Sequence, residues 1–304
     1  TRAAWSGGNI DNINPSLKRD LEAGFSISGA DLDAPGSVNW FYRVDNVNLD
    51  FLAKDETITL TYIVTITDNN GATDTDTITI RIIGRNDKPE ITSGINDFGF
   101  TEEDNASSQS LSHSGTLLFK DIDSNDNISV SSQVTTRAAW SGGNIDTINS
   151  SLRNALEGGF SISVSAPGSV SWLYSVDDIN LDFLAKDDTI TLTYTITISD
   201  TNAIATDKVT IRITGTNDKP RIDNDNTIVS GQVVEAANKV DGTIVSGTSS
   251  ISGTVSSYDV DNNSIITWSI VVENNPSITY GNFDIDTNTG CLLYTSPSPR
   301  DLMR

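Results

Sequence analysis

The sequence predicts an all-β protein of tandem β-sandwich repeats with a short helical insertion. Three observations predict this fold class. Apolar and polar residues alternate over segments of strand length, turn-forming residues separate these segments, and long stretches of sequence recur at the spacing of a whole domain. Each observation is developed below.

Alternation is clearest over residues 57–67, where threonines on one side face isoleucine, leucine, tyrosine and valine on the other. A period of two is typical of a strand with one wet and one buried face, and β-branched residues suit both faces. The Asp-Asn-Asn-Gly stretch at 68–71 supplies hairpin-turn chemistry before the alternation resumes at Ile78, Ile80 and Ile82. These patterns predict a half-buried antiparallel sheet.

One short helix is predicted to interrupt the strands. Residues 14–24 begin with Asn14 as N-cap and Pro15 at the first helical position, and they end at Gly24. A second copy at 149–158 keeps Leu152 and Leu156 four residues apart, on one helix face.

Long segments recur along the chain. Residues 1–11 return unchanged at 136–146, and residues 48–62 return at 180–194 with Asp188 in place of Glu56. The Gly-Arg-Asn-Asp-Lys-Pro stretch at 84–89 returns at 215–220 with threonine for arginine. The period of roughly 131 to 135 residues is that of a domain rather than of a solenoid repeat.

A third copy begins where residues 252–261 repeat the spacing of residues 114–123. We therefore expect the C-terminal part of one repeat at 1–89, a complete repeat at 90–220, and the N-terminal part of a third at 221–290. The chain starts inside a repeat, and its one methionine is Met303, so we expect an internal piece of a longer protein.

The C-terminal tail is set apart. Residues 291–301 correspond to a translated transposon-end sequencing adaptor, so we interpret residues 291–304 as an artefact and exclude them from the fold prediction. Cys291, the one cysteine, belongs to this tail. The rest of the chain therefore offers neither disulfides nor a thiol nucleophile.

The net charge of the chain restricts which partners it can bind. The 41 acidic residues against 19 basic ones give a formal charge of −22. Such a field repels nucleic acid and anionic membrane surfaces and attracts cations. Solubility or adaptation to salt explains an acidic surface equally well. No apolar run is long enough to span a bilayer, so no membrane span is expected.

Acidic residues recur in the same order near both predicted repeat boundaries. Each boundary has an Asn-Asp pair, then a glutamate, then an Asp-x-Asp. Ca²⁺ takes six to eight oxygen ligands, and such a set supplies them. Turn formation is the alternative for a single Asp-x-Asp, but the recurrence favours calcium. We predict one site at the first boundary and another at the second: Asn86, Asp87, Glu102, Glu103, Asp121 and Asp123; Asn217, Asp218, Glu235, Asp259 and Asp261.

Two aromatic pairs each combine a tryptophan with a tyrosine two residues further along the chain. Trp40 with Tyr42, and Trp172 with Tyr174, lie on one face of a strand, where they suit either the sandwich core or stacking on a saccharide ring. We favour the core. Trp5 and Trp140 fall in Trp-Ser-Gly-Gly stretches, where we expect exposure in loops.

The sequence lacks the residue arrangements of common catalytic sites. His113 is the one histidine and belongs to no Ser/His/Asp arrangement, no glycine-rich phosphate loop is present, and the usual zinc sites lack their ligands. We expect no enzymatic activity.

These motifs together resemble the VCBS repeat, a cadherin-like and Ig-like module found in tandem in giant RTX-type bacterial adhesins. The resemblance is carried over residues 1–290 by Ser-Gly-Thr-x4-Asp-x-Asp, Trp-x-Tyr, the Leu-Asp-Phe-Leu-Ala-Lys-Asp segment and the Asn-Asp-Lys-Pro ending. Lys88 and Lys219 replace the family's usual alanine, and Arg85 replaces threonine; a lysine beside a cation site weakens the calcium reading.

The resemblance implies export, a cell-surface or matrix location, and a role in adhesion or biofilm formation. Neighbouring repeats would be the direct partners, and other domains would bind surface or matrix polysaccharide. The expected function is a structural spacer stiffened by calcium. The alternatives are a carbohydrate-binding module and an accessory module of a secreted hydrolase.

Overall fold

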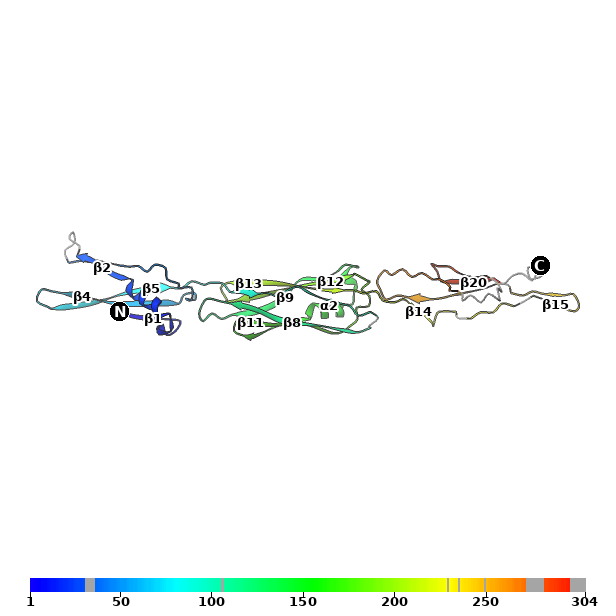
Figure 1. Ribbon diagram of the computed structural model, residues 1–304, viewed down its shortest axis with the longest axis horizontal. Helices are drawn as coiled ribbons and strands as arrows, with labels where there is room; N and C mark the ends of the chain where they lie inside the picture. The colour runs from blue at the N-terminus through cyan, green and yellow to red at the C-terminus, as the bar shows by residue number, and fades with distance from the viewer. Residues whose placement is uncertain are drawn as a thin grey trace.

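The computed structural model describes residues 1–30, 36–104, 107–228, 230–234, 236–248, 250–271 and 282–295. Its strands fall into three groups that follow one another along a rod (Figure 1). We call these groups unit 1 (residues 1–83), unit 2 (90–214) and unit 3 (221–295). Each described sheet takes all its strands from one unit. Linkers 84–89 and 215–220 join the units.

Unit 2 is a sandwich of two four-stranded sheets, as the alternation predicts. One sheet has the order β10-β11-β8-β6 and the other the order β7-β13-β12-β9. Within the second sheet β7 runs parallel to β13. The strands are β6 (Glu90–Ser93), β7 (Phe98–Thr101), β8 (Gln109–Lys120), β9 (Ser129–Trp140), β10 (Phe160–Ala166), β11 (Ser169–Ile179), β12 (Thr189–Ser199) and β13 (Ile204–Thr214).

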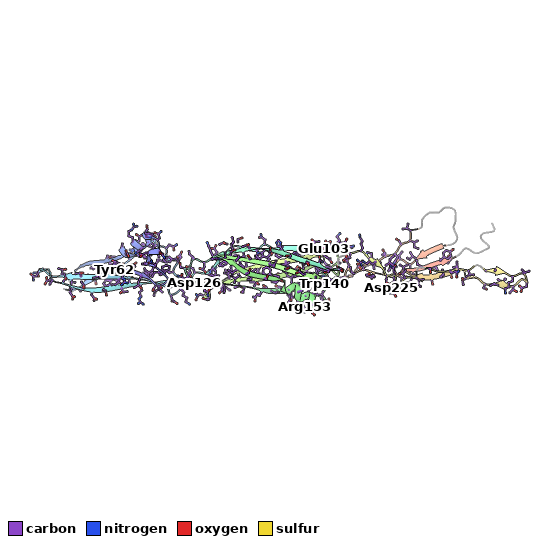
Figure 2. The ribbon with its side chains drawn as sticks, turned by 90° about the horizontal axis from the view of Figure 1, so that it is seen from below. Tyr62, Glu103, Asp126, Trp140, Arg153 and Asp225 are labelled. Atoms are coloured by element: carbon purple, nitrogen blue, oxygen red, sulfur yellow. The ribbon has the colours of Figure 1, made fainter. Side chains whose placement is uncertain are left out.

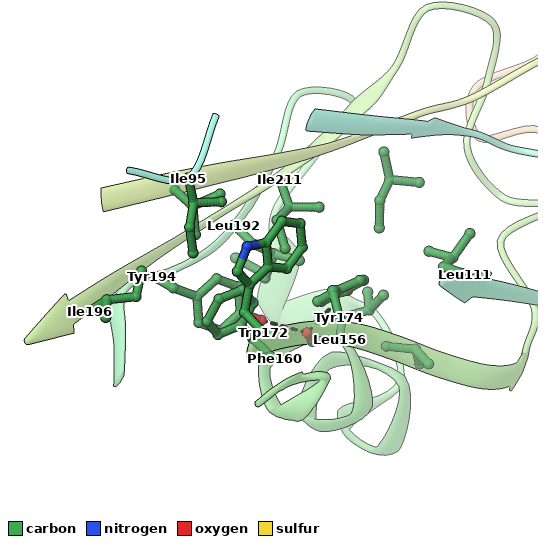
Figure 3. Packing of buried hydrophobic residues seen from close by; sticks show 14 of the residues in the cluster. Ile95, Leu111, Leu156, Phe160, Trp172, Tyr174, Leu192, Tyr194, Ile196 and Ile211 are labelled. Atoms are coloured by element: carbon green, nitrogen blue, oxygen red, sulfur yellow. Dashed lines mark hydrogen bonds between the residues drawn. The ribbon is translucent and has the colours of Figure 1, made fainter. Parts of the chain in front are cut away.

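The core of unit 2 lies between these sheets (Figure 3). Alternate residues of β12, from Ile190 to Ile198, point inward and are almost fully buried. Two buried tyrosines tie the sheets to α2 (Ser150–Gly158): the hydroxyls of Tyr174 and Tyr194 donate to the Leu156 carbonyl over 3.2 and 2.9 Å. The Tyr194 hydroxyl also lies 3.1 Å from the Glu157 carbonyl. These hydroxyls satisfy carbonyls that a helix end leaves unpaired.

The helical insertion is confirmed in both copies. In α1 (Pro15–Ala23) Asn14 accepts a hydrogen bond from the Ser16 amide, and Asn149 does the same for the Ser151 amide of α2, each over 2.8 Å. Short 3-10 turns, η1 (Ile10–Asn12) and η2 (Ile145–Thr147), precede the helices. Within the described ranges, neither helix has the length and apolarity to cross a membrane.

Unit 1 repeats the second part of unit 2. Its β1 matches the end of β9, its β2–β3 hairpin matches β10–β11, and its β4–β5 hairpin matches β12–β13. A smaller core forms around Leu21, Leu52, Ile58 and Leu60. The strands are β1 (Arg2–Trp5), β2 (Phe25–Ala30), β3 (Val38–Tyr42), β4 (Thr57–Thr67) and β5 (Thr73–Ile83).

Unit 3 has shorter strands in three small sheets. Residues 291–295, which the sequence assigns to an adaptor-derived tail, form β20 between β17 and β19; their origin stays a prediction. The strands are β14 (Arg221–Ile222), β15 (Ala237–Asn238), β16 (Ile244–Val245), β17 (Ser250–Thr254), β18 (Ser257–Tyr258), β19 (Asn282–Ile285) and β20 (Cys291–Thr295).

The aromatic pairs differ between units. Trp172 and Tyr174 are buried in unit 2, which confirms the core interpretation there, whereas Trp40 is 48% exposed in unit 1. The expectation that Trp5 and Trp140 are loop-exposed was wrong. Both end strands, are partly buried, and donate from Nε1 to an acid, Trp140 to Asp188 over 3.2 Å.

Substitution of Tyr194 by phenylalanine tests the tyrosine anchor. Tyr194→Phe removes the donor to the end of α2, and we expect it to lower the free energy of unfolding of unit 2 by about 1–3 kcal/mol, since buried carbonyls lose a partner. Chemical denaturation followed by tryptophan fluorescence measures this. Tyr258→Phe, at a 48% exposed position, is the control and should leave the curve unchanged. If the two variants unfold along the same curve, the Tyr194 hydroxyl does not stabilise unit 2.

Candidate cation sites at the two junctions

Each linker is packed tightly against the unit before it. In the second linker, Gly215 donates to the Asp188 carbonyl over 2.8 Å and accepts from the Asp187 amide. A Cβ at Gly215 would lie 2.4 Å from the Leu184 carbonyl oxygen, and Gly84 is equally close to the Leu52 carbonyl oxygen. Only glycine permits this approach, and it places the following Asn-Asp beside the Leu-Asp-Phe-Leu loop.

The linker aspartate then binds the Asp-x-Asp of the next unit. At the first junction the Asp87 amide donates to Asp123 Oδ2 over 2.8 Å, and the Asp123 amide donates to Asp121 Oδ1 over 3.1 Å. The second junction repeats both bonds: Asp218 to Asp261, and Asp261 to Asp259, each over 3.0 Å. The structure thus brings together the linker and Asp-x-Asp parts of both predicted sites.

At each junction, backbone hydrogen bonds also link the two neighbouring units to each other. The Ser124 amide of unit 2 donates to the Phe51 carbonyl of unit 1 over 2.9 Å, and the Asn262 amide of unit 3 donates to the Phe183 carbonyl of unit 2 over 3.0 Å. Asn262 Nδ2 reaches back farther, to the Gly142 carbonyl over 2.9 Å.

The predicted grouping of the glutamates was wrong. Glu102 lies not at the first junction but at the second, where its Oε2 accepts from the Thr216 amide over 3.0 Å. The cause is the parallel pairing of β7 with β13, which carries the end of β7 to the end of unit 2 where the chain leaves for unit 3. Glu103 is exposed at that same end (Figure 2). Glu235 lies outside the described residues.

At the second junction three acids converge. Carboxylate oxygens of Glu102, Asp182 and Asp218 lie within 4.8 Å of one another. Glu102 is 3% exposed and Asp218 is 1% exposed. The sequence-based prediction did not include Asp182, because the Leu-Asp-Phe-Leu segment that contains it was interpreted only as a marker of the repeat. The identical segment in the first copy, with Asp50 at the matching position, was the signal that could have identified it.

A different trio converges at the first junction. Carboxylate oxygens of Asp121, Asp126 and Asp200 lie within 4.8 Å of one another, and Asn86 Nδ2 donates to Asp200 Oδ2 over 3.0 Å. Figure 2 shows Asp126 at the end of unit 2 that faces unit 1, opposite Trp140. Asp126 and Asp200 were also missed, since both resemble ordinary turn residues in the sequence.

Several buried acceptor oxygens at these junctions lack donors. Such atoms are costly to bury without a partner, and a carboxylate more than an amide. Within the described part of the chain, these atoms are Oδ1 of Asn86, Oδ2 of Asp121, Oδ1 of Asp123, Oδ2 of Asp126, Oε1 of Glu102, Oδ1 of Asp182 and Oδ1 of Asp261.

The electrostatics agree with the geometry. Burial, with the charges of Asp218, Asp182 and Asp261, raises the pKa of Glu102 to about 8, against a favourable hydrogen bond from Thr216. Burial likewise raises the pKa of Asp123 to about 6. The pKa values of Asp126, Asp182 and Asp261 are also raised, burial being the largest cause. These groups favour a proton or a cation in their surroundings.

Asp200 is the exception. Burial alone would raise its pKa, but hydrogen bonds from the Ala203 and Asn202 amides and from the Asn86 side chain outweigh burial and lower it. Asp200 therefore stays charged beside Asp121 and Asp126, and the first trio keeps a fixed negative charge.

Comparison with known proteins found similar solved structures at low identity. No family model and no curated protein matches the chain. The titin domains Z1Z2 in complex with telethonin are similar at 10% identity and a TM-score of 0.30, over 70% of this chain and 84% of that one. The cadherin domains 1–4 of protocadherin gamma B7 are similar at 12% identity and a TM-score of 0.30, over 92% of this chain and 59% of that one.

The N-terminal Ig1-2 module of the Drosophila receptor protein tyrosine phosphatase DLAR is similar at 10% identity and a TM-score of 0.24, over 71% of this chain and 87% of that one.

The raised pKa values predict how the free energy of unfolding depends on pH when no divalent cation is present. Glu102 titrates near 8 when folded and near 4.5 when unfolded, so the folded chain binds more protons between these values. The free energy of unfolding therefore rises as the pH falls through this window. Asp200, with its lowered pKa, opposes this only in more acidic solution.

We expect the melting temperature in chelator to be higher near about pH 5 than near about pH 8, because protonation relieves the buried charge. Scanning calorimetry across this range measures it. Glu102→Gln, which stays neutral, should flatten the dependence. A melting temperature that rises steadily with pH in wild type would contradict the prediction.

Proposed function

We propose that the chain is a structural spacer of a large secreted or surface-attached bacterial adhesin, stiffened by Ca²⁺ bound at the junctions between its repeats. One observation carries the proposal: buried carboxylate oxygens without donors converge at both junctions. At the first junction they come from unit 2, beside a donor-less amide oxygen of the linker residue Asn86. At the second junction unit 2 supplies Glu102 and Asp182, and unit 3 supplies Asp261.

The donor set supports calcium over other metals. Every candidate ligand atom is a carboxylate or amide oxygen, with neither imidazole nor thiolate among the described residues of either trio. Hard oxygen donors from several flexible segments suit Ca²⁺, which tolerates irregular coordination, more than Mg²⁺, which demands a near-octahedral shell.

Stiffening follows from where the ligands sit. Without a cation, like charges crowded at a junction repel one another, and the hydrogen bonds of the linker have to hold the units against that repulsion. A bound cation offsets the repulsion. It joins unit 2 to the linker at the first junction, and unit 2 to unit 3 at the second. The end-to-end order of the units (Figure 1) then becomes an extended spacer.

The spacer role accounts for the structure better than the alternatives do. Trp172 is buried, which removes the aromatic platform from unit 2 and weakens the carbohydrate-binding hypothesis. The acids lie at repeated junctions rather than in one cleft, which argues against a hydrolase site and for a chain without catalytic activity. Extracellular location at the bacterial surface, where calcium is abundant, completes the proposal.

Calcium should raise the melting temperature. Saturation at about 100 times the dissociation constant adds about 2.7 kcal/mol per site to the free energy of unfolding. Scanning calorimetry in millimolar calcium and in chelator measures the shift, with magnesium as the control cation. If the melting curves in calcium and in chelator coincide, the acidic residues serve only as surface and turn residues.

Substitutions test whether the three acids of the second junction are responsible for the calcium-dependent shift. Glu102→Gln and Asp182→Asn should each reduce the calcium-dependent shift, since each removes a charged ligand of the second junction. Glu103→Gln is the matched control: it changes the same charge one residue away at an exposed position, and the shift should remain.

Small-angle X-ray scattering tests the stiffness itself. We expect a longer maximum dimension and a narrower distance distribution in calcium than in chelator, because bound cations hold the units in line. Asp126→Ser, which removes a ligand of the first junction only, should restore part of the flexibility. An unchanged distribution in wild type would mean that the junctions are rigid without metal.

A further inference from the structure

The Trp-Ser-Gly-Gly loops of units 1 and 2 lie at the junctions but belong to neither acid trio. Figure 2 shows Trp140 at the end of unit 2 that faces unit 3. Each tryptophan packs edge-on against the phenylalanine of the Leu-Asp-Phe-Leu segment, with ring centroids 5.3 Å apart for Trp5 and Phe51 and 5.1 Å apart for Trp140 and Phe183. The loop and this segment therefore form one packed body at each junction.

An acid completes this body. Trp5 Nε1 donates to Glu56 Oε2, and Trp140 Nε1 donates to Asp188 Oδ2, each over 3.2 Å. A Cβ at Gly7 would overlap the Glu56 carboxylate, and the matching glycine of unit 2 is equally close to its acid, so the loop needs glycine there. We call each body the tryptophan socket: residues 5–8, 51 and 56 in unit 1, and residues 140–143, 183 and 188 in unit 2.

An asparagine side chain from the following unit contacts each socket. At the first junction Asn125 Nδ2 donates to the Gly7 carbonyl over 2.9 Å and to Glu56 Oε1 over 3.0 Å. At the second, Asn262 Nδ2 donates to the Gly142 carbonyl over 2.9 Å. A carboxamide has two N–H donors and no charge, so it can satisfy a carbonyl and a carboxylate together. All of these hydrogen bonds join protein groups directly, without a metal ion.

A backbone hydrogen bond beside the asparagine restricts rotation about the linker. The Ser124 amide, next to Asn125, donates to the Phe51 carbonyl of the same socket, and the Asn262 amide does so to Phe183. Two contacts on one packed body hold an orientation that a single contact leaves free to turn. Lys54 Nζ also donates to an Asn202 side chain across the first junction over 3.1 Å, but the described residues show no matching contact at the second.

The two sockets differ in reach, and so do their partners. Glu56 is replaced by the shorter Asp188, the one change between residues 48–62 and 180–194. The asparagine comes two residues after the Asp-x-Asp at the first junction and one residue after it at the second. The longer acid contacts its asparagine, whereas the shorter acid leaves the asparagine to the glycine carbonyl.

We propose that the tryptophan socket of each repeat is a docking site for one asparagine side chain of the following repeat, and that this contact selects the relative orientation of the two repeats without a metal ion. The inference goes beyond the calcium-stiffened spacer, because the socket lies outside both acid trios. A bound cation then narrows the spread of orientations around the one that the socket selects.

Distances between two spin labels test the orientation. Thr79→Cys in unit 1 and Ser163→Cys in unit 2, both exposed, carry the labels in a Cys291→Ser background, and double electron-electron resonance gives the distance distribution. In chelator the wild type should keep the most populated distance that it has in calcium. Asn125→Ala should lower the population at that distance about fivefold, the effect of losing about one net hydrogen bond.

The control is Asn127→Ala, which removes an exposed asparagine two residues away and should leave the distribution unchanged. If the wild type in chelator lacks the distance seen in calcium, or if Asn125→Ala keeps it as the control does, the socket does not select the orientation.

Glu56→Asp tests the socket from the other side of the junction. Asp188 still accepts from its indole, so the shorter acid should keep unit 1 folded and its melting temperature unchanged. It loses its reach to Asn125, and the population at the docked distance should fall between those of wild type and Asn125→Ala. A population equal to that of wild type would contradict the role of the acid. Since the charge is kept, the calcium-dependent melting shift should remain, and that shift reports the proposed function separately.

Discussion

Negative charge taken out of water at the ends of the sandwich is the constraint on which the rest of the structure depends. Glu102 and Asp218 are almost fully buried within reach of Asp182, and Asp123 is buried beside Asp121. Isolated buried carboxylates are strongly disfavoured, so they require protons, donors or a cation. The glycine of each linker and the parallel placement of β7 both serve to bring these groups together.

Unit 2 contributes to both of its junctions by different means. Its β12–β13 turn brings Asp200 to the end that faces unit 1, while β7 and the Leu-Asp-Phe-Leu loop bring Glu102 and Asp182 to the end that faces unit 3. Unit 2 therefore supplies acids to both candidate sites. Duplication of the repeat therefore duplicates the acids of the candidate sites along with the strands.

Much of the fold could be predicted from the sequence because it rests on local patterns. Alternation predicts strands, Asn14 with Pro15 predicts the helix, and the repeats predict the tandem order. The site was only partly predictable. Glu102 was assigned to the wrong junction because strand direction is a property of the sheet and not of local sequence. Asp126 and Asp200 look like turn residues, and only the fold brings them beside Asp121. Trp140 seemed exposed because its partners, Asp188 and Phe183, lie far along the chain.

The parallel pairing of β7 with β13 has a mechanical consequence. The chain enters unit 2 at one end and leaves at the other, so tension applied along the rod acts along these strands rather than across them. Their hydrogen bonds, from Phe98 opposite Ile211 to Thr101 opposite Thr214, are then loaded in shear and have to fail together instead of one at a time. Strands loaded in shear resist a pulling force better than strands whose hydrogen bonds open one after another.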